Sequence, residues 1–228
     1  MAERSVVLLG KGRLAIRVAE WFHAHPDWSL EVVVPVVPEP AWTDSFGEWA
    51  AERGVPMVAD GDFTGLLVGG GKVADLAISI FYDRILSAAF IGRCGWVLNL
   101  HNGPLPRYRG VSPINWALKN GERSHGVTIH EVTPGIDDGP IVAQLTYSIY
   151  PEQDEVEDVL NRALAYGWAL FEQTMPILGR IEPLPQDESQ ATYYGAAENR
   201  LLGERRSFTR AASLADAEVA PYSLESPA

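Results

Sequence analysis

The sequence contains one cysteine, Cys94, among 228 residues. A single cysteine can form neither an internal disulfide nor a multi-cysteine metal site. The sequence also lacks an apolar run near the roughly 20 residues that a membrane-spanning helix needs. Its N-terminal residues lead directly into a strand-like run and lack the order of a signal peptide. We therefore expect a cytoplasmic protein with no membrane partner.

Basic residues are scarce as well: 18 Lys and Arg stand against 30 Asp and Glu, for a net charge of −12. Such a charge repels polyphosphate backbones, so we expect no nucleic-acid partner. The length of 228 residues is enough for one good-sized domain or for one domain with a small appendage. Hydrophobic residues make up 46% of the chain, a normal share for a globular protein.

Short apolar runs alternate with helical patterns along the chain. The predicted strands are residues 5–9, 30–37, 74–81, 96–99, 126–132 and 140–150. The predicted helices are residues 14–25, 45–53, 88–91, 113–120 and 152–179. This alternation predicts an α/β fold with a mostly parallel twisted sheet and helices on both faces. We expect a main domain over residues 1–180, a short extension packed on it over residues 181–212, and a disordered tail over residues 213–228.

The predicted strand 96–99 runs into a segment of turn residues, Asn102-Gly103-Pro104 and Pro106. Asn99 and His101 therefore lie at the carboxyl end of a strand, where open α/β sheets bind ligands. The two residues are two positions apart, so their side chains share one face of the strand. An amide donor beside an imidazole that titrates near neutrality suits acyl transfer.

A second loop places Asp137 and Asp138 before Gly139-Pro140. If the strand 126–132 lies beside the strand that ends at Asn99, an aspartate of this loop can reach His101. A carboxylate there would raise the pKa of the imidazole and fix its orientation. Spacing alone leaves open whether one aspartate does this or only caps the turn.

Two weaker patterns remain. Gly10-x-Gly12-x-x-Ala15 fits either a loose dinucleotide fingerprint or a tight strand-to-helix turn, and Glu31 lies at the front of its strand, where a ribose-binding acid does not belong. No histidine shows a metal-ligand spacing, so no metal site is predicted. Solvated or capping roles are expected for His23, His25, His125 and His130.

Six motifs follow one another in the middle of the chain. They are Asn99-Leu100-His101, Leu105-Pro106-Arg107-Tyr108-Arg109-Gly110, Pro113-Ile114-Asn115-Trp116-Ala117, Asn120-Gly121-Glu122, Gly126-Val127-Thr128-Ile129-His130 and Asp137-Asp138-Gly139-Pro140-Ile141-Val142. In order and spacing these motifs resemble the folate-dependent formyltransferases, strongly over residues 74–144 and more weakly over residues 152–179. The resemblance implies a Rossmann-like fold, with residues 1–180 as the catalytic domain. It also implies transfer of a formyl group from 10-formyltetrahydrofolate to a primary amine.

The resemblance also implies the residues of the site. The family's catalytic asparagine, histidine and aspartate fall on Asn99, His101 and Asp137, because the family's aspartate stands two residues before the glycine that precedes Pro140. The implied contacts of the formyl donor are Phe81, Tyr82, Arg84, Ile85, Leu86, Ile136 and Asp137. The implied contacts of the amine substrate are Gly10, Lys11, Asn102, Gly103, Pro104 and Arg109.

The implied mechanism is attack of the unprotonated amine on the formyl carbon. The Asn99 amide and a protonated His101 would stabilise the oxyanion that develops. Asp137 would orient His101, favour its charged form and relay the proton of the amine through a bound water.

Departures from the family narrow the expected substrate. Gly12-Arg13-Leu14 lacks the serine and asparagine with which glycinamide ribonucleotide transformylases hold a phosphate, and Asn102-Gly103 replaces the usual proline-serine or glycine-serine. About fifty residues follow Gly179, and this is fewer residues than the tRNA-binding domain of methionyl-tRNA formyltransferases contains. The central motif is most similar to amino-sugar formyltransferases, so the expected partner is a small-molecule amine on a nucleotide-linked sugar.

Several alternatives stay open. Within the same reaction, a siderophore-type or antibiotic-type amine is the next candidate. Outside it, the chain could be an NAD(P)-dependent oxidoreductase that uses the Gly10 loop, or a catalytically silent folate-binding module. A homodimer is compatible with each reading.

Overall fold

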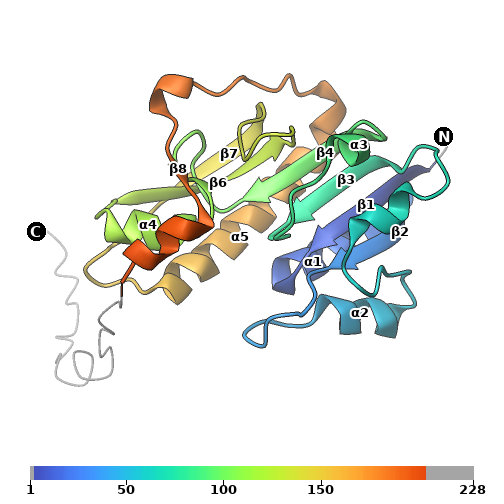
Figure 1. The fold of residues 1–228 in the computed structure, drawn as a ribbon, viewed down its shortest axis with the longest axis horizontal. Coiled ribbons are helices and arrows are strands. Elements are labelled where there is room, and N and C mark those ends of the chain that lie inside the picture. Colours follow the sequence, from blue (N-terminus) through green and yellow to red (C-terminus); the bar gives the residue numbers. More distant parts are fainter. Residues whose placement is uncertain (1–2, 204–228) are drawn as a thin grey trace, which may run out of the picture.

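A computed structural model describes residues 3–203 of the chain (Figure 1). Its centre is a six-stranded sheet with the strand order β2-β1-β3-β4-β6-β7. The strands are β1 (Arg4–Gly10), β2 (Trp28–Pro35), β3 (Ala74–Ile80), β4 (Cys94–His101), β6 (Ser124–Glu131) and β7 (Ile141–Ser148). The first four strands in this order run parallel, whereas β6 pairs antiparallel with both β4 and β7. The predicted tail, residues 213–228, and residues 204–212 of the predicted extension lie outside the described residues.

Helices cover both faces of the sheet. Successive residues of its buried strands point to opposite faces, and apolar residues occupy both sets of positions, so each face needs a covering layer. On one face, Val6 and Leu8 pack in the same cluster as residues of α1 (Gly12–Ala24), α2 (Phe46–Arg53), α4 (Pro113–Lys119) and α5 (Val156–Thr174). On the other, Val7 and Leu9 pack with residues of α3 (Ala88–Ile91) and the 3₁₀ helix η1 (Phe63–Leu67). The predicted mostly parallel sheet with helices on both faces is confirmed.

Helix α5 is shorter at both ends than the helix that the apolar pattern predicts. The predicted helix 152–179 begins only at Val156, because Glu155 and Asp158 form a reciprocal capping box there. It ends at Thr174 and continues as a 3₁₀ helix, η2 (Met175–Arg180), with Pro176 in its first turn.

Strand β4 extends two residues past its predicted end, to His101, and Asn99 lies opposite His130 of β6. The hairpin loop of residues 132–140, between β6 and β7, consequently lies next to Asn99. This places Asp137 beside the carboxyl end of β4, where it contacts Asn99 and His101.

Residues 181–203, called the strap below, run across the ends of these strands (orange to red in Figure 1). The strap contains η3 (Glu188–Gln190), β8 (Tyr193–Tyr194) and η4 (Ala196–Leu201). Strand β8 pairs in parallel with β5 (Arg109–Gly110), and Leu184 exchanges two backbone hydrogen bonds with Ile141 of β7. The strap is therefore hydrogen-bonded both to β5, which follows β4 in the chain, and to the first residue of β7.

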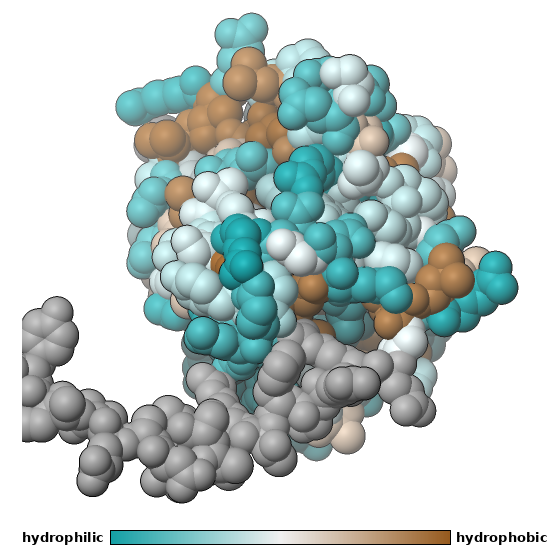
Figure 2. All heavy atoms as spheres, turned by 90° about the vertical axis from the view of Figure 1, so that its left-hand side faces the viewer, coloured by the Kyte–Doolittle hydropathy of each residue, from teal (hydrophilic) through white to brown (hydrophobic). Residues whose placement is uncertain are grey.

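Figure 2 shows the face on the left-hand side of Figure 1, where α4 lies. This face is hydrophilic or neutral over most of its area, and apolar side chains gather near its upper and right-hand margins. Among residues 3–203, none of the helices has the length and apolar character needed to cross a membrane.

Candidate active site

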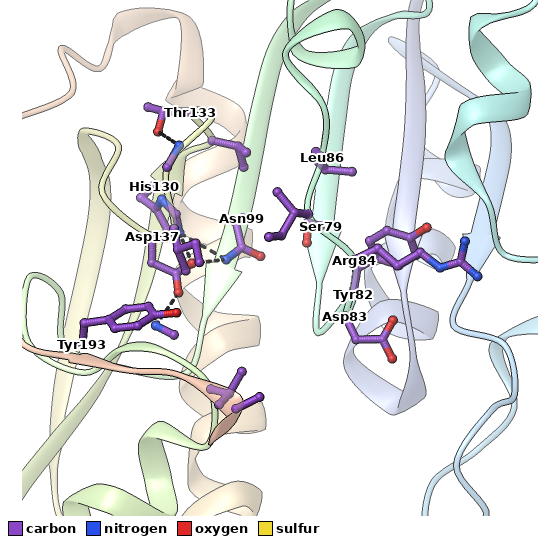
Figure 3. Close-up of a pocket in the computed structure, with 17 residues that line it drawn as sticks. Ser79, Tyr82, Asp83, Arg84, Leu86, Asn99, His130, Thr133, Asp137 and Tyr193 are labelled. Carbon is purple, nitrogen blue, oxygen red and sulfur yellow. Dashed lines mark hydrogen bonds and ion pairs between the residues drawn. The ribbon is translucent and has the colours of Figure 1, made fainter. Parts of the chain in front are cut away.

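A cavity of about 380 Å³ opens at the carboxyl ends of β3 and β4 (Figure 3). Asn99 and Asp137 line it, together with His130 and with Tyr193 of the strap. Most of the residues expected to contact the formyl donor line it too, namely Tyr82, Arg84, Ile85, Leu86, Ile136 and Asp137. Phe81 does not line this cavity; it packs against the core cluster that includes Val6 and Leu8.

Asn99 is the polar group at the centre of the site. Its Nδ2 donates to Asp137 Oδ1 over 3.3 Å and to His130 Nε2 over 3.1 Å. His130 Nε2 can accept this bond because His130 Nδ1 donates to the Glu131 carbonyl at 2.8 Å, which leaves Nε2 unprotonated in the neutral ring. In Figure 3 the Asn99 side-chain oxygen points away from these partners, toward Ser79. The longer bond to Asp137 is the one that an incoming acceptor can displace most easily.

His101 lies behind Asp137, buried, and does not line the cavity. Its Nε2 donates to the Tyr108 carbonyl at 2.8 Å, and its Nδ1 lies 3.5 Å from Asp137 Oδ2. Burial lowers the pKa of His101 below its ordinary value, although the Asp137 carboxylate opposes this. The 3.5 Å separation also exceeds a charge-assisted hydrogen bond. Burial thus opposes the protonated His101 that the resemblance implies, and in a neutral ring whose Nε2–H bonds to the Tyr108 carbonyl it is Nδ1 that lacks a proton.

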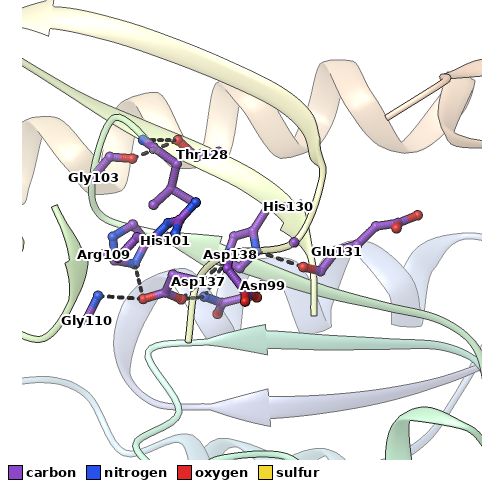
Figure 4. A network of polar contacts seen from close by, with 12 residues as sticks. Asn99, His101, Gly103, Arg109, Gly110, Thr128, His130, Glu131, Asp137 and Asp138 are labelled. Carbon is purple, nitrogen blue, oxygen red and sulfur yellow. Dashed lines mark hydrogen bonds and ion pairs between the residues drawn. The ribbon is translucent and has the colours of Figure 1, made fainter. Parts of the chain in front are cut away.

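The two adjacent aspartates have different surroundings (Figure 4). Asp137 Oδ2 accepts from the Gly110 N–H at 2.8 Å, and its other oxygen accepts from Asn99. Burial acts to raise the pKa of Asp137, but His101 and His130, when protonated, and the Gly110 N–H together hold it below its ordinary value. Asp138, in contrast, is exposed and accepts from the Thr133 hydroxyl. Only Asp137 meets Asn99 and His101.

Hydrogen bonds from β6 hold the loop after β4 in place, and this loop does not line the cavity. Thr128 Oγ1 donates to the Gly103 carbonyl at 2.7 Å, and His125 Nε2 donates to the Asn102 carbonyl at 2.9 Å. A Cβ on Gly103 would lie 2.7 Å from His101 Nε2, so the close approach of this loop to the imidazole requires glycine. Asn102, Gly103 and Pro104 do not line the described cavity, and their contact with an amine stays a prediction.

The other expected substrate contacts are also engaged within the protein. The Arg109 guanidinium is buried and binds Gln186 and Glu188 of the strap. Lys11 Nζ lies 3.9 Å from Asp83, which lines the cavity, and Gly10 approaches β3 so closely that a Cβ would lie 2.1 Å from the Ile80 carbonyl oxygen. Lys11 is thus near the cavity, whereas Arg109 lies outside its lining.

Sequence reasoning missed two buried histidines. His130 and His125 were expected to be solvated or capping, but their exposed fractions are 2% and 0%. His130 lines the cavity and holds the Asn99 amide. The burial of His130 could have been predicted from the strand 126–132. Side chains alternate between the two faces of a strand, so His130 shares a face with Thr128.

Burial of His125 predicts an acid-dependent loss of stability. Its pKa is lowered by burial from 6.5 to about 4, so between these pH values the unfolded chain takes up a proton that the folded protein excludes. The free energy of unfolding should fall by about 3 kcal/mol through this residue as the pH drops from 6.5 to 4. We expect His125→Gln to show a shallower decline than the parent protein in urea unfolding at several pH values.

The exposed His23 offers a matched control, because His23→Gln should leave the slope of stability against pH unchanged. Equal slopes for the parent protein and His125→Gln would contradict the assignment of a buried neutral imidazole to His125.

Within residues 3–203, no cluster of three or more His, Cys, Asp or Glu side chains is arranged to hold a metal ion. What the site offers is an amide donor, a carboxylate and an imidazole in sequence from the cavity inward. Such an arrangement can stabilise a developing oxyanion and accept a proton.

Residues 71–174 match the sequence profile of the formyl transferase family. The methionyl-tRNA formyltransferase of Deinococcus radiodurans is 40% identical over 153 residues, which cover 63% of this chain and 46% of that protein. This chain thus spans about half the length of that relative.

Among solved structures, the sugar 3N-formyl transferase WlaRD, in the presence of dTDP and 5-N-formyl-THF, superposes with a TM-score of 0.73 at 21% identity, covering 87% of this chain and 72% of that one. An N-formyltransferase from Helicobacter canadensis, in complex with folinic acid and dTDP-3-aminofucose, gives a TM-score of 0.73 at 24% identity, covering 85% and 71%. Such identities establish a shared fold. Together with the profile match, which spans Asn99, His101 and Asp137, they confirm the resemblance: residues 71–174 of this chain are similar to the formyl transferase family.

Proposed function

We propose that this protein is an N-formyltransferase that moves a formyl group from 10-formyltetrahydrofolate to the primary amine of a small molecule. The observation that carries the proposal is the meeting of Asn99 and His101, at the end of β4, with Asp137 of the loop between β6 and β7. The cavity beside them has an apolar wall, which includes Leu86, Val132 and Ile136, and an exposed cation, Arg84. Such a cavity suits a flat heterocycle joined to a carboxylate tail.

The proposed chemistry assigns one role to each group. The amine nitrogen attacks the formyl carbon, and the Asn99 amide donates to the oxygen that becomes negative. Asp137 takes a proton from the amine, and His101 Nδ1, 3.5 Å away, receives it. The bond from the formyl carbon to its original nitrogen then breaks, and the proton returns to that nitrogen. The products are a formamide and tetrahydrofolate, with all atoms balanced.

A nucleotide-linked amino sugar is the substrate class we propose. Both formyltransferase structures named above, which share this fold, contain a dTDP group, and in one of them an aminofucose is attached to it. Tyr193 of the strap lines the cavity and is 55% exposed, so it offers a free ring against which a planar base can stack.

Formylation of an aminoacylated tRNA is the second candidate, and the 40% identity to a methionyl-tRNA formyltransferase favours it. The net charge of −12 opposes it, because it repels a polyphosphate chain.

The deciding experiment incubates the protein with 10-formyltetrahydrofolate and a panel of amines, with product masses read by mass spectrometry. The panel contains nucleotide-linked amino sugars, a hydroxyornithine-type amine and aminoacylated initiator tRNA. We expect formamide products, with the largest kcat/KM for a nucleotide-linked sugar. Faster formylation of tRNA would move the assignment to the second candidate.

The same samples test the remaining alternatives. Folate binding without any formamide product would indicate a catalytically silent module. Turnover of NAD(P)H, followed by its absorbance, would indicate an oxidoreductase that uses the Gly10 loop.

A further inference from the structure

Gln186 of the strap is the point where three parts of the site meet. Its Nε2 donates to the Asp137 carbonyl at 2.8 Å and to the Gly139 carbonyl at 2.7 Å. Its Oε1 accepts from Arg109 Nε at 3.0 Å and Nη2 at 2.8 Å. Both N–H groups and the oxygen of this amide are thus used, and the residue lies outside the segment that matches the family profile.

The Asp137 backbone needs such a partner. Asp137 has a φ of 51°, in the left-handed region that residues other than glycine seldom occupy. A residue holds this conformation only when the surrounding contacts determine it. The two bonds from Gln186 fix the carbonyls on the Asp137 side of the turn, and thereby the direction in which its carboxylate points.

Arg109 connects this support to the carboxylate itself. Its guanidinium is held between Gln186 and Glu188, with Nη2 2.6 Å from Glu188 Oε1. The next residue, Gly110, donates its N–H to Asp137 Oδ2 at 2.8 Å (Figure 4). Gln186 therefore fixes the Asp137 main chain directly and helps to hold, through Arg109, the N–H that binds the side chain.

We propose that Gln186 is a positioning residue for Asp137, so that the strap completes the catalytic site; this inference rests on the proposed formyl transfer. A neutral amide fits this place because it presents donors to two carbonyls and an acceptor to a guanidinium. A glutamate would direct a carboxylate oxygen at the two carbonyls, and a leucine would satisfy neither side.

The test compares Gln186→Leu and the nearly isosteric Gln186→Glu with Gln190→Leu. Gln190 is exposed on the same strap and its amide donates to Asp187, away from the Asp137 loop. We expect both Gln186 variants to lose about 10²-fold in kcat, the cost of a displacement near 1 Å at a reacting group, with the KM for the donor little changed. Gln190→Leu should keep the parent kcat.

A double-mutant cycle separates positioning from a general loss of structure. If Gln186 acts through Asp137, Gln186→Leu should lower kcat little further in an Asp137→Asn background. Losses that multiply instead would overturn the proposal. Should Gln186→Leu fail to fold, Gln186→Glu serves in the same cycle.

Amide hydrogen exchange measured by NMR gives a readout that needs no turnover. The Gly110 N–H bonds to Asp137 Oδ2, so it should exchange faster in both Gln186 variants and at the parent rate in Gln190→Leu. Unchanged exchange at Gly110, or unchanged kcat in an active enzyme, would refute the positioning role. A parent protein that formylates no amine would refute the proposed function, and the Gly110 exchange would still decide whether Gln186 holds the loop.

Discussion

Replacing Asn99 with alanine is expected to lower kcat by about 10²–10³-fold, the usual cost of removing one donor to an oxyanion. The Asn99 amide lines the cavity and is held in place by His130 behind it. Its bond to Asp137 is long at 3.3 Å, so exchanging this bond for one to a full oxyanion favours the transition state over the ground state. Steady-state kinetics with the best amine of the panel provides the measurement.

Two controls make this result specific. Asn161→Ala removes an exposed asparagine from α5 and should leave kcat unchanged. Urea unfolding of Asn99→Ala should show a loss of about 1–3 kcal/mol, because the substitution leaves the buried His130 Nε2 without its hydrogen-bond partner. A kcat within a few-fold of the parent value in a folded Asn99→Ala would remove Asn99 from the mechanism.

Local patterns were sufficient for much of the fold. The alternation of apolar strands and helices predicts the sheet, and the period of two along β4 places Asn99 and His101 on one face. Both residues do contact Asp137. These features depend on residues close together in the chain, which is why the sequence alone carries them.

Features that depend on contacts between residues far apart in the chain could not be predicted from local sequence patterns. His130 holds the Asn99 amide because β6 runs antiparallel to β4 in a register that sets these residues opposite each other. Gln186 reaches Asp137 across 49 residues from a segment without clear periodicity. Burial lowers the pKa of His101, and the local sequence does not display this burial; it shows only the neighbouring carboxylate, which acts in the opposite direction.

The change with the largest expected effect distinguishes two adjacent aspartates. Asp137→Asn should reduce kcat by about 10²–10⁴-fold, because it removes the group that accepts the proton of the amine. Asp138→Asn makes the same chemical change one residue away, on a side chain that is exposed and bonded to Thr133. Its kcat should stay within about twofold of the parent value, since surface substitutions of this kind seldom have large effects. Equal losses in the two variants would mean that the proton-accepting role has been assigned to Asp137 wrongly.

The pH profile of these variants tests the mechanism as well as the residue. His101 must be neutral to receive a proton at Nδ1, so kcat should fall as the pH drops through the His101 pKa. Burial lowers that pKa and the Asp137 carboxylate raises it, so removing the carboxylate lowers it further. The acid limb should therefore move to lower pH in Asp137→Asn and stay in place in Asp138→Asn. A limb that moved to higher pH in Asp137→Asn would mean that His101 does not take up the proton.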